Sequence, residues 1–335
     1  MTSSYPSVMV MMPVRNEQHH LVQAVESVLA QKYPGELEIV LALGPSVDDT
    51  DNVAKDLAAK YPSIKLVRNP KGLTTAGLNL AIGTSTSDVI ARVDAHSEIG
   101  ENYLTRGVQI LAETNSVLVG GIMNARGSSP FQKAVAFGYG SRFGLGGGRY
   151  HLGGQAGEAE SAYLGIFDAK ALRAVGGYDE KIIRGEDWDL AQRLKANGGR
   201  VWFSPELKVN YWPRSNMKAL AWQFYSTGVW RGELTRRAPA KASLRYFLPP
   251  LALLLLVGVV VLAAIGILGE LEVIIPIALY LLVISFAAAT AKELTIIDRL
   301  SVLLALPVMH LSWALGFWVG LAFGARKTID AGDKK

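Results

Sequence analysis

Residues 88–96, DVIARVDAH, join a short apolar run to two side chains that can bind a metal ion. An apolar run of this length, bounded by polar residues, predicts a buried strand. Asp94 and His96 come directly after it and are one residue apart, so both can lie on the same side of an extended segment. A carboxylate at the end of a strand does not contribute to a hydrophobic core. We therefore expect these two residues at the rim of a sheet, in a binding site.

The segments before this strand alternate between strand-like and helix-like patterns. We expect strands at 7–14, 37–43, 64–69 and 88–94, and helices at 19–31, 50–62 and 73–85. This alternation predicts βαβ units, and hence an α/β fold with a mostly parallel, doubly wound sheet. Ligands of such sheets bind beyond the carboxyl ends of the strands. The polar residues expected there are Arg15, Asn16 and Glu17, then Ser46, Asp48 and Asp49, then Asp94 and His96.

Composition narrows the classes of function. The chain has no cysteine, which excludes disulfides, thiolate catalysis and cysteine zinc sites. A net charge of +5 without a nucleic-acid-binding motif gives no reason to expect a nucleic acid partner. The N-terminal segment lacks the basic region of a signal peptide, so we expect the first domain to stay in the cytoplasm.

The C-terminal part, residues 247–335, predicts a membrane domain. Uncharged runs at about 247–269 and 273–291 are each near the ~20 residues needed to cross ~30 Å of hydrocarbon. A third run, 301–324, contains Pro307 and His310 and either spans the membrane or lies in its interface. If only two runs span the membrane, the basic C-terminal residues stay on the same side as the first domain, in agreement with the positive-inside tendency. The length of the third run favours a third span instead. We expect two or three transmembrane helices.

A basic, aromatic segment at 208–246 separates this part from a catalytic domain at 1–207. From Lys208 to Arg245 it has eight Lys or Arg residues and one acidic residue, Glu233. The interleaved aromatic residues are Tyr211, Trp212, Trp222, Phe224, Tyr225 and Trp230. This mixture suits the headgroup layer of an anionic leaflet, although a solvated basic face over core aromatics is the alternative. We predict a membrane-interface segment and a substrate that carries a lipid tail.

A second acidic group stands in GEDWDLAQRL, residues 185–194. Glu186, Asp187 and Asp189 lie at the predicted start of a helix, where acids are favourable for capping alone. Three acids around Trp188 are more than a cap requires. A carboxylate held there can act as a general base toward a hydroxyl group.

Glycine marks two further segments. Gly176 and Gly177 permit a tight turn shortly before the acidic group. Residues 137–154 are rich in glycine and predict a mobile loop, either a lid over a bound substrate or a plain connector. They do not form a dinucleotide fingerprint, because no clear strand precedes them and no clear helix follows.

In this order, the segments resemble the family 2 glycosyltransferases of the GT-A fold, over about residues 5–235. The matching motifs are MMPVRNE, GPSVDDT, NPKGLTTAGLNLAI, VDAH in place of Asp-x-Asp, and GGYDE followed by GEDWDLAQRL. Together with the apolar end, the chain most resembles succinoglycan-type bacterial glycosyltransferases of polysaccharide assembly. The resemblance implies a nucleotide-diphospho-sugar transferase fold followed by transmembrane helices. It also implies a multi-pass protein of the bacterial inner membrane with a cytoplasmic catalytic domain.

The resemblance implies a role for each matching residue. Asp94 and His96 would hold a divalent metal on the donor diphosphate, and nitrogen ligation by His96 favours Mn²⁺ over Mg²⁺. Asp187 would be the catalytic base, with Glu186 beside it. The other donor-binding or nucleotide-binding residues would be Pro13, Arg15, Glu17, Ser46, Asp48, Lys71 and Asn79. The residues of an acceptor-side or closing element would be Trp188, Trp230 and Arg231. The sequence departs from the family at Leu43 and Gly44, which stand where an acidic residue commonly reads the nucleotide base.

We therefore expect an inverting, metal-dependent transfer from a nucleotide diphosphate sugar, a UDP-sugar by resemblance, to a hydroxyl of a lipid-linked (polyprenyl) saccharide. The product would belong to polysaccharide or cell-envelope glycan synthesis. One alternative is a polyprenyl phosphate acceptor, which is already anionic and needs no base. Another is a non-catalytic membrane sensor or docking protein on a transferase fold. The sequence does not identify the sugar, the linkage or the oligomeric state.

Overall fold

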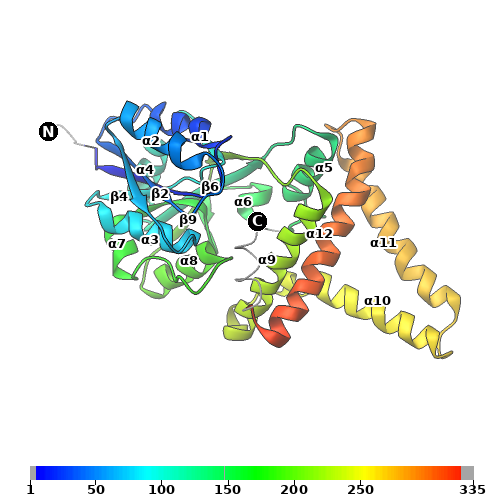
Figure 1. Ribbon diagram of the computed structural model, residues 1–335. Helices are drawn as coiled ribbons and strands as arrows, with labels where there is room; N and C mark the ends of the chain where they lie inside the picture. Colours follow the sequence, from blue (N-terminus) through cyan, green and yellow to red (C-terminus); the bar gives the residue numbers. More distant parts are fainter. Residues whose placement is uncertain (1–4, 147, 326–335) are drawn as a thin grey trace. The chain divides into compact units, whose positions relative to one another are not determined.

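The computed structural model describes residues 5–146 and 148–325 of the chain. The protein divides into two compact units, Met1–Asn124 with Gly148–Tyr211, and Ala125–Gly147 with Trp212–Lys335. Figure 1 shows the strands in the first unit and the long C-terminal helices in the second. The division after Tyr211 lies close to the predicted boundary at 207/208. Residues 125–147, which we expected in the first domain, group instead with the C-terminal helices.

One nine-stranded sheet forms the centre of the first unit, in the order β3-β2-β1-β4-β8-β6-β9-β5, with β7 paired to β9. The strands are β1 (Val8–Val14), β2 (Leu37–Leu43), β3 (Ile64–Arg68), β4 (Val89–Arg92), β5 (Ser97–Ile99), β6 (Leu118–Ala125), β7 (Gly157–Glu158), β8 (Tyr163–Asp168) and β9 (Val201–Tyr211). The four predicted strands are confirmed, and they pair in parallel.

The rest of the sheet is not parallel. β8 runs antiparallel to both β4 and β6, and β9 runs antiparallel to β5 and β7. The sheet is therefore mixed rather than mostly parallel. Each parallel neighbour needs a helical crossover, and the strand–helix alternation that supplies crossovers ends with β4.

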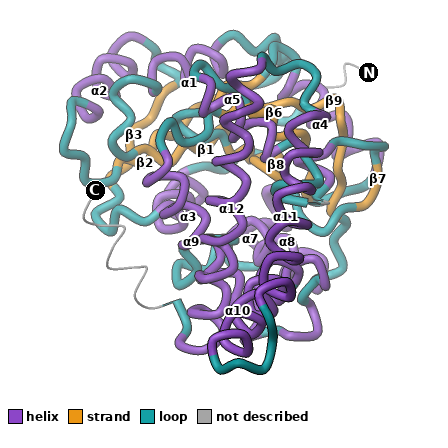
Figure 2. Tube along the Cα trace, turned by 90° about the vertical axis from the view of Figure 1, so that its right-hand side faces the viewer, coloured by secondary structure: helices purple, strands orange, loops and turns teal. Residues whose placement is uncertain are grey.

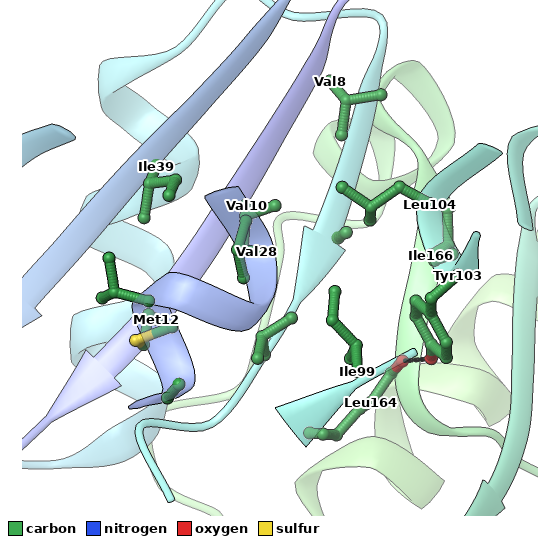
Figure 3. Packing of buried hydrophobic residues seen from close by; sticks show 14 of the residues in the cluster. Val8, Val10, Met12, Val28, Ile39, Ile99, Tyr103, Leu104, Leu164 and Ile166 are labelled. Carbon is green, nitrogen blue, oxygen red and sulfur yellow. Dashed lines mark hydrogen bonds between the residues drawn. The ribbon is translucent and has the colours of Figure 1, made fainter. Parts of the chain in front are cut away.

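Helices cover both faces of this sheet, as the tube in Figure 2 shows. They are α1 (Leu21–Leu29), α2 (Thr50–Lys60), α3 (Thr74–Thr84), α4 (Tyr103–Thr114), α6 (Arg149–Leu152), α7 (Ala169–Ala174) and α8 (Glu186–Ala196). Alternation along β1 builds a core on each face, because successive side chains of a strand point to opposite sides. Val8, Val10 and Met12 pack with residues of α1, α2 and α4 (Figure 3), whereas Met9 and Met11 pack with residues of α3, α7 and α8.

The second unit is helical. It contains α5 (Pro130–Tyr139), α9 (Met217–Arg237), the short 3₁₀ helices η1 (Pro239–Lys241) and η2 (Leu244–Tyr246), α10 (Leu248–Ala264), α11 (Glu270–Thr290) and α12 (Ile296–Phe323). Three helices, at Leu244–Ala264, Glu270–Thr290 and Ile296–Phe323, are long and apolar enough to cross a membrane. The protein is thus a membrane protein by the length and composition of these helices.

The predicted glycine-rich loop at 137–154 is shorter than expected. Its first residues belong to α5, and 149–152 form α6. Helix α5 begins with Pro130 in its first turn, after Ser129, whose hydroxyl accepts a hydrogen bond from the backbone N–H of Gln132 (3.2 Å). This N-cap outweighs the glycines that follow, so the helix persists to Tyr139.

Candidate functional site

The loops after β1 and β2 interlock at the carboxyl edge of the sheet. Asn16 adopts a left-handed backbone conformation (φ 55°), which is uncommon outside glycine. In that conformation its backbone N–H donates to the hydroxyl of Ser46 (3.0 Å), and its side-chain oxygen accepts from the N–H of Val47 (2.9 Å). Both loops after the first two strands are therefore held in one arrangement, at the place where the sequence predicted donor binding.

Asp48 and Glu17 share a partner in this arrangement. The hydroxyl of Thr50 donates to Asp48 (2.5 Å) and accepts from the backbone N–H of Glu17 (2.7 Å). Although burial raises the pKa of Asp48, hydrogen bonds from Thr50 and from the N–H of Gln18 hold that pKa below its ordinary value. Asp48 is ionised at neutral pH and fixed in position.

Pro13 and Arg15 flank the end of β1. Strand β4 ends opposite Met11, so beyond that point β1 has a sheet neighbour on one side only, which is where a strand tolerates proline. The Nε of Arg15 donates to the carbonyl of Pro45 (3.2 Å), which ties the β1 loop to the β2 loop once more.

Lys71 and Asn79 contact the turn at Gly176 and Gly177. The side chain of Asn79 donates to the carbonyl of Tyr178 and accepts from its N–H, both at 2.8 Å. Lys71 pairs with Glu180 at 2.5 Å. Both glycines have positive φ, as the predicted turn requires. The structure thus shows Asn79 as the residue that holds this turn on α3.

Arg92, the last residue of β4, joins the two predicted halves of the site. Its side chain is 5% exposed and contacts three carboxylates. Nε donates to Asp94 at 2.8 Å, and one terminal nitrogen donates to Asp187 at 2.8 Å and to Glu186 at 3.2 Å. The carboxylate after β4 and the two at the start of α8 therefore form one buried ion cluster around a single guanidinium group.

The cluster sets the charge of its members. Burial acts to lower the pKa of Arg92, but its three carboxylate neighbours raise that pKa well above the ordinary value. Burial raises the pKa of Asp94, and Arg92 and His96 more than offset this, so the net pKa of Asp94 is low. Asp94 is an anion at neutral pH, which is the state that binds a cation.

Asp187 differs from Asp94. Burial raises its pKa to about 7, with Glu186 and Asp94 adding to the rise and Arg92 opposing it. The side chain is 25% exposed, so it is the most accessible carboxylate of the cluster. A carboxylate that gains and loses its proton near pH 7 matches the requirement for a general base at neutral pH.

His96 is oriented by Glu17. Its Nδ1 lies 2.9 Å from a carboxylate oxygen of Glu17, which comes from the loop after β1. With the proton on Nδ1, the lone pair is on Nε2, and this carboxylate–histidine arrangement is typical of metal ligands. Among the residues that the structure describes, no three His, Asp or Glu side chains are grouped to hold a metal ion. A cation held by Asp94 and His96 would need further ligands from outside these two side chains.

The three residues predicted for the acceptor side fall in different places. Trp188 is buried, and its indole N–H donates to Glu160 (2.7 Å) within the first unit. Trp230 and Arg231 belong to α9 of the second unit, where Trp230 is buried and the guanidinium of Arg231 lies 4.2 Å from the ring centre of Tyr246.

Sequence reasoning missed Arg92, the residue with the most partners in the site. A signal was present, since Arg92 is a lone cation inside an otherwise apolar strand, and a buried charge needs a partner. Glu180 and Glu160, which contact Lys71 and Trp188, were also missed. Glu180 is the last residue of the GGYDE motif, to which no separate role was assigned, whereas nothing in the local sequence of Glu160 distinguishes it from a surface acid.

Comparisons with known proteins show the family of the chain. Residues 9–164 match the family described as glycosyl transferase family 2. Over 316 residues the chain is 30% identical to the succinoglycan biosynthesis protein ExoA of Rhizobium meliloti (strain 1021), covering 93% of this chain and 94% of that protein.

A more distant relative and a solved structure extend the likeness. The dolichyl N-acetyl-alpha-D-glucosaminyl phosphate 3-beta-D-2,3-diacetamido-2,3-dideoxy-beta-D-glucuronosyltransferase of Methanococcus voltae is 23% identical over 239 residues, which are 69% of this chain and 74% of that protein. The mannosyltransferase PcManGT from Pyrobaculum calidifontis, solved in complex with GDP-Man and Mn²⁺, has a TM-score of 0.64 at 18% identity. The match covers 96% of this chain and 88% of that one. The structural likeness shows a shared fold.

Proposed function

Because the chain belongs to glycosyl transferase family 2, we propose that it transfers a sugar from a nucleotide diphosphate sugar to a hydroxyl of a lipid-linked saccharide, with inversion at the anomeric carbon. The observation that carries the proposal is the cluster around Arg92. It joins Asp94, on the predicted donor side, to Asp187, on the predicted acceptor side, through contacts of 2.8 Å.

Asp187 takes the proton of the acceptor hydroxyl in this proposal. Its pKa of about 7 leaves a large fraction ionised at neutral pH while keeping the carboxylate basic enough to accept a proton. The acceptor oxygen attacks the anomeric carbon, and the bond from that carbon to the diphosphate oxygen breaks. The transfer is direct, so the chain needs no nucleophile of its own. Arg92 keeps the Asp187 carboxylate in a fixed orientation.

Asp94 and His96 would hold a divalent cation, and we propose Mn²⁺ rather than Mg²⁺ because of the nitrogen ligand. A bound cation supplies positive charge where the leaving diphosphate becomes more negative. The ionised state of Asp94 and the contact between His96 and Glu17 support this assignment. Structural likeness to a mannosyltransferase solved with GDP-Man and Mn²⁺ is consistent with it.

The interlocked loops at Ser46 and Asp48 are the proposed place of the nucleoside. By resemblance the donor is a UDP-sugar, but Leu43 and Gly44 stand where an acid commonly reads the base. A thermal-shift screen of UDP-sugars and GDP-sugars, with and without Mn²⁺, tests the donor and the metal together, because a ligand of the native state raises the unfolding temperature.

Exchange of Asp187 for asparagine tests the mechanism. We expect Asp187→Asn to lower sugar transfer by about 10²–10⁴-fold, which is the range for loss of a general base, while the donor still raises the unfolding temperature. Transfer at the wild-type rate would exclude Asp187 as the base and favour the polyprenyl phosphate acceptor, which needs none. Acid lability of the product is the second readout, since sugar–phosphate and sugar–sugar linkages differ in it.

A further inference from the structure

Helices α10 and α11 form a hairpin, and α12 contacts the start of α10 and adjoins the end of α11. Its first residue, Ile296, follows the end of α11 after a short connection, and Arg299 donates to the carbonyl of Ala291 (3.0 Å). Near its other end, the indole N–H of Trp318 donates to the carbonyl of Pro250 (3.0 Å), in the first turn of α10. Figure 1 shows α12 crossing the open end of this hairpin, beside α9.

The ends of a membrane hairpin lie at the same surface. Helices α10 and α11 have 17 and 21 residues, or about 26 and 32 Å, which suits ~30 Å of hydrocarbon. The first turn of α10 and the last turn of α11 are then at one membrane face. Ile296 adjoins the end of α11, and Trp318 contacts the start of α10. These two residues are about 33 Å apart along α12. Contacts with one face at points so far apart fit a helix that lies along that face.

The partners of α12 support the same placement. Against α9 the two backbones approach closely, since a Cβ on Gly320 would lie 1.8 Å from the carbonyl oxygen of Val229 and one on Gly232 would lie 2.2 Å from that of Phe317. The part of α9 beside the end of α12 carries Glu233, which is paired with Arg236 and Arg237. If α12 crossed the membrane, these charges would accompany its far end into or through the hydrocarbon, where charged groups are strongly disfavoured.

The opposite end of α12 has a polar neighbour too. Lys133 of α5 lies 3.7 Å from Asp298 in the first turn of α12, and Met309 packs against Gly138 of α5. Helices α5 and α9 therefore cover one side of α12 along its length. The uncovered side is a stripe of exposed apolar residues at helical spacing, 44–67% exposed: Ile297, Leu300, Leu304, Leu311 and Leu315. Charged groups therefore lie beside both ends of the covered side of α12, at Asp298 and at Glu233, while its other side is an apolar stripe.

We propose that α10 and α11 are the two membrane-spanning helices and that α12 lies in the plane of the membrane surface, with its apolar stripe in the acyl layer of the lipid. The segments before α10 and after α12 are then on the same side of the bilayer. Of the two placements expected for the run at 301–324, this is the one in the interface. The proposal does not depend on the enzymatic activity.

Depth measurements distinguish the two placements. The chain has no cysteine, so single cysteines at the five stripe positions can each carry a spin label. The full-length protein is reconstituted in vesicles of phosphatidylethanolamine and phosphatidylglycerol, and the accessibility to oxygen and to a water-soluble nickel complex gives each label's depth. We expect one shallow depth for all five labels. A span would separate positions 297 and 311 by about 21 Å of depth, and such a gradient would overturn the proposal.

Helix α11 supplies the matched control. Its exposed apolar residues Leu271, Ile275, Leu279, Leu282 and Phe286 have comparable exposure, and labels there should show the depth gradient of a span. Sidedness is the second measurement, with a membrane-impermeant maleimide on right-side-out membrane vesicles. We expect Glu293→Cys and Phe323→Cys to react from the same side, opposite to Ile267→Cys between α10 and α11. Reaction of Phe323→Cys from the side of Ile267→Cys would refute the in-plane helix.

Discussion

Replacing Arg92 by glutamine should move the pH dependence of sugar transfer to higher pH. In the proposed mechanism the rate follows the ionised fraction of Asp187. With a pKa of about 7, that fraction is about one-eleventh at pH 6 and about ten-elevenths at pH 8. The wild-type kcat/KM for the acceptor should therefore rise about tenfold from pH 6 to pH 8, because the base works only after losing its proton.

The size of the shift follows from the contact between Arg92 and Asp187. Two unit charges about 4 Å apart interact by roughly 4 kcal/mol at an effective dielectric constant of 20, which corresponds to about three pKa units. The Asp187 side chain is 25% exposed, so solvent reduces this value. We expect the pKa of Asp187 to rise by at least about one unit in Arg92→Gln, since burial, Glu186 and Asp94 remain and all raise it. The variant should be at least about fivefold slower at pH 7, because a one-unit rise lowers the ionised fraction from about one-half to about one-eleventh, and it should recover as the pH rises.

The assay is the initial rate of transfer to acceptor between pH 5.5 and 9.5 at saturating donor, with purified full-length protein in detergent. Arg92→Lys keeps a positive charge and should keep the midpoint near that of the wild type. Arg106→Gln is the control, because Arg106 also pairs with two carboxylates, Glu113 and Glu206, which are more than half exposed and have no ion pair with the cluster. It should leave the profile unchanged.

One result would refute the reasoning. If Arg92→Gln lost activity equally at every pH while it still bound the donor, Arg92 would not act through the charge of Asp187. Loss of a buried ion-pair partner costs about 3–5 kcal/mol, so donor binding and the unfolding temperature are measured on the same preparation. A wild-type rate that did not change between pH 6 and 8 would remove Asp187 as the titrating base.

Three further predictions concern stability and metal. Burial raises the pKa of Asp187, so the protonated Asp187 side chain stabilises the fold at low pH, and this stabilisation is lost as the pH rises from about 4 to about 7. The unfolding temperature of Asp187→Asn, relative to that of the wild type, should therefore increase across that window. A difference that did not change with pH would contradict the raised pKa. Gly320→Ala should lower the unfolding temperature, by the equivalent of about 1–3 kcal/mol or more, because the new Cβ would meet the backbone of α9. Gly258→Ala on α10 is the control and should be neutral, because a Cβ there has nothing within 4 Å. Equal effects of the two substitutions would argue against the close approach of α9 and α12. Chelation of divalent ions should abolish transfer, and His96→Asp should shift the preference of restored activity from Mn²⁺ toward Mg²⁺. The same Mn²⁺ to Mg²⁺ activity ratio in that variant would exclude His96 as a ligand.

The order of helices and strands could be predicted from the sequence, because the spacing of apolar residues differs between a helix and a strand. Strand β2 and helices α2 and α3 fall where the pattern placed them, within two residues at each end. The residues expected at the carboxyl edge of the sheet also lie there, since parallel strands end at a common rim. The antiparallel half of the sheet was not predicted, because strand pairing joins segments far apart in the chain and leaves no local period.

What the sequence determined by itself was local: the β1–β4 elements, the apolar helices, and the positions of Asp94, His96, Glu186 and Asp187. Only the tertiary structure decided which charges share a buried cluster. Arg92 meets Asp187 across 95 residues of chain, and α12 meets the start of α10 across 68. The physical reason is that periodicity and capping act over a few residues, whereas an ion pair or a helix–helix contact depends on which distant segments the whole fold brings together.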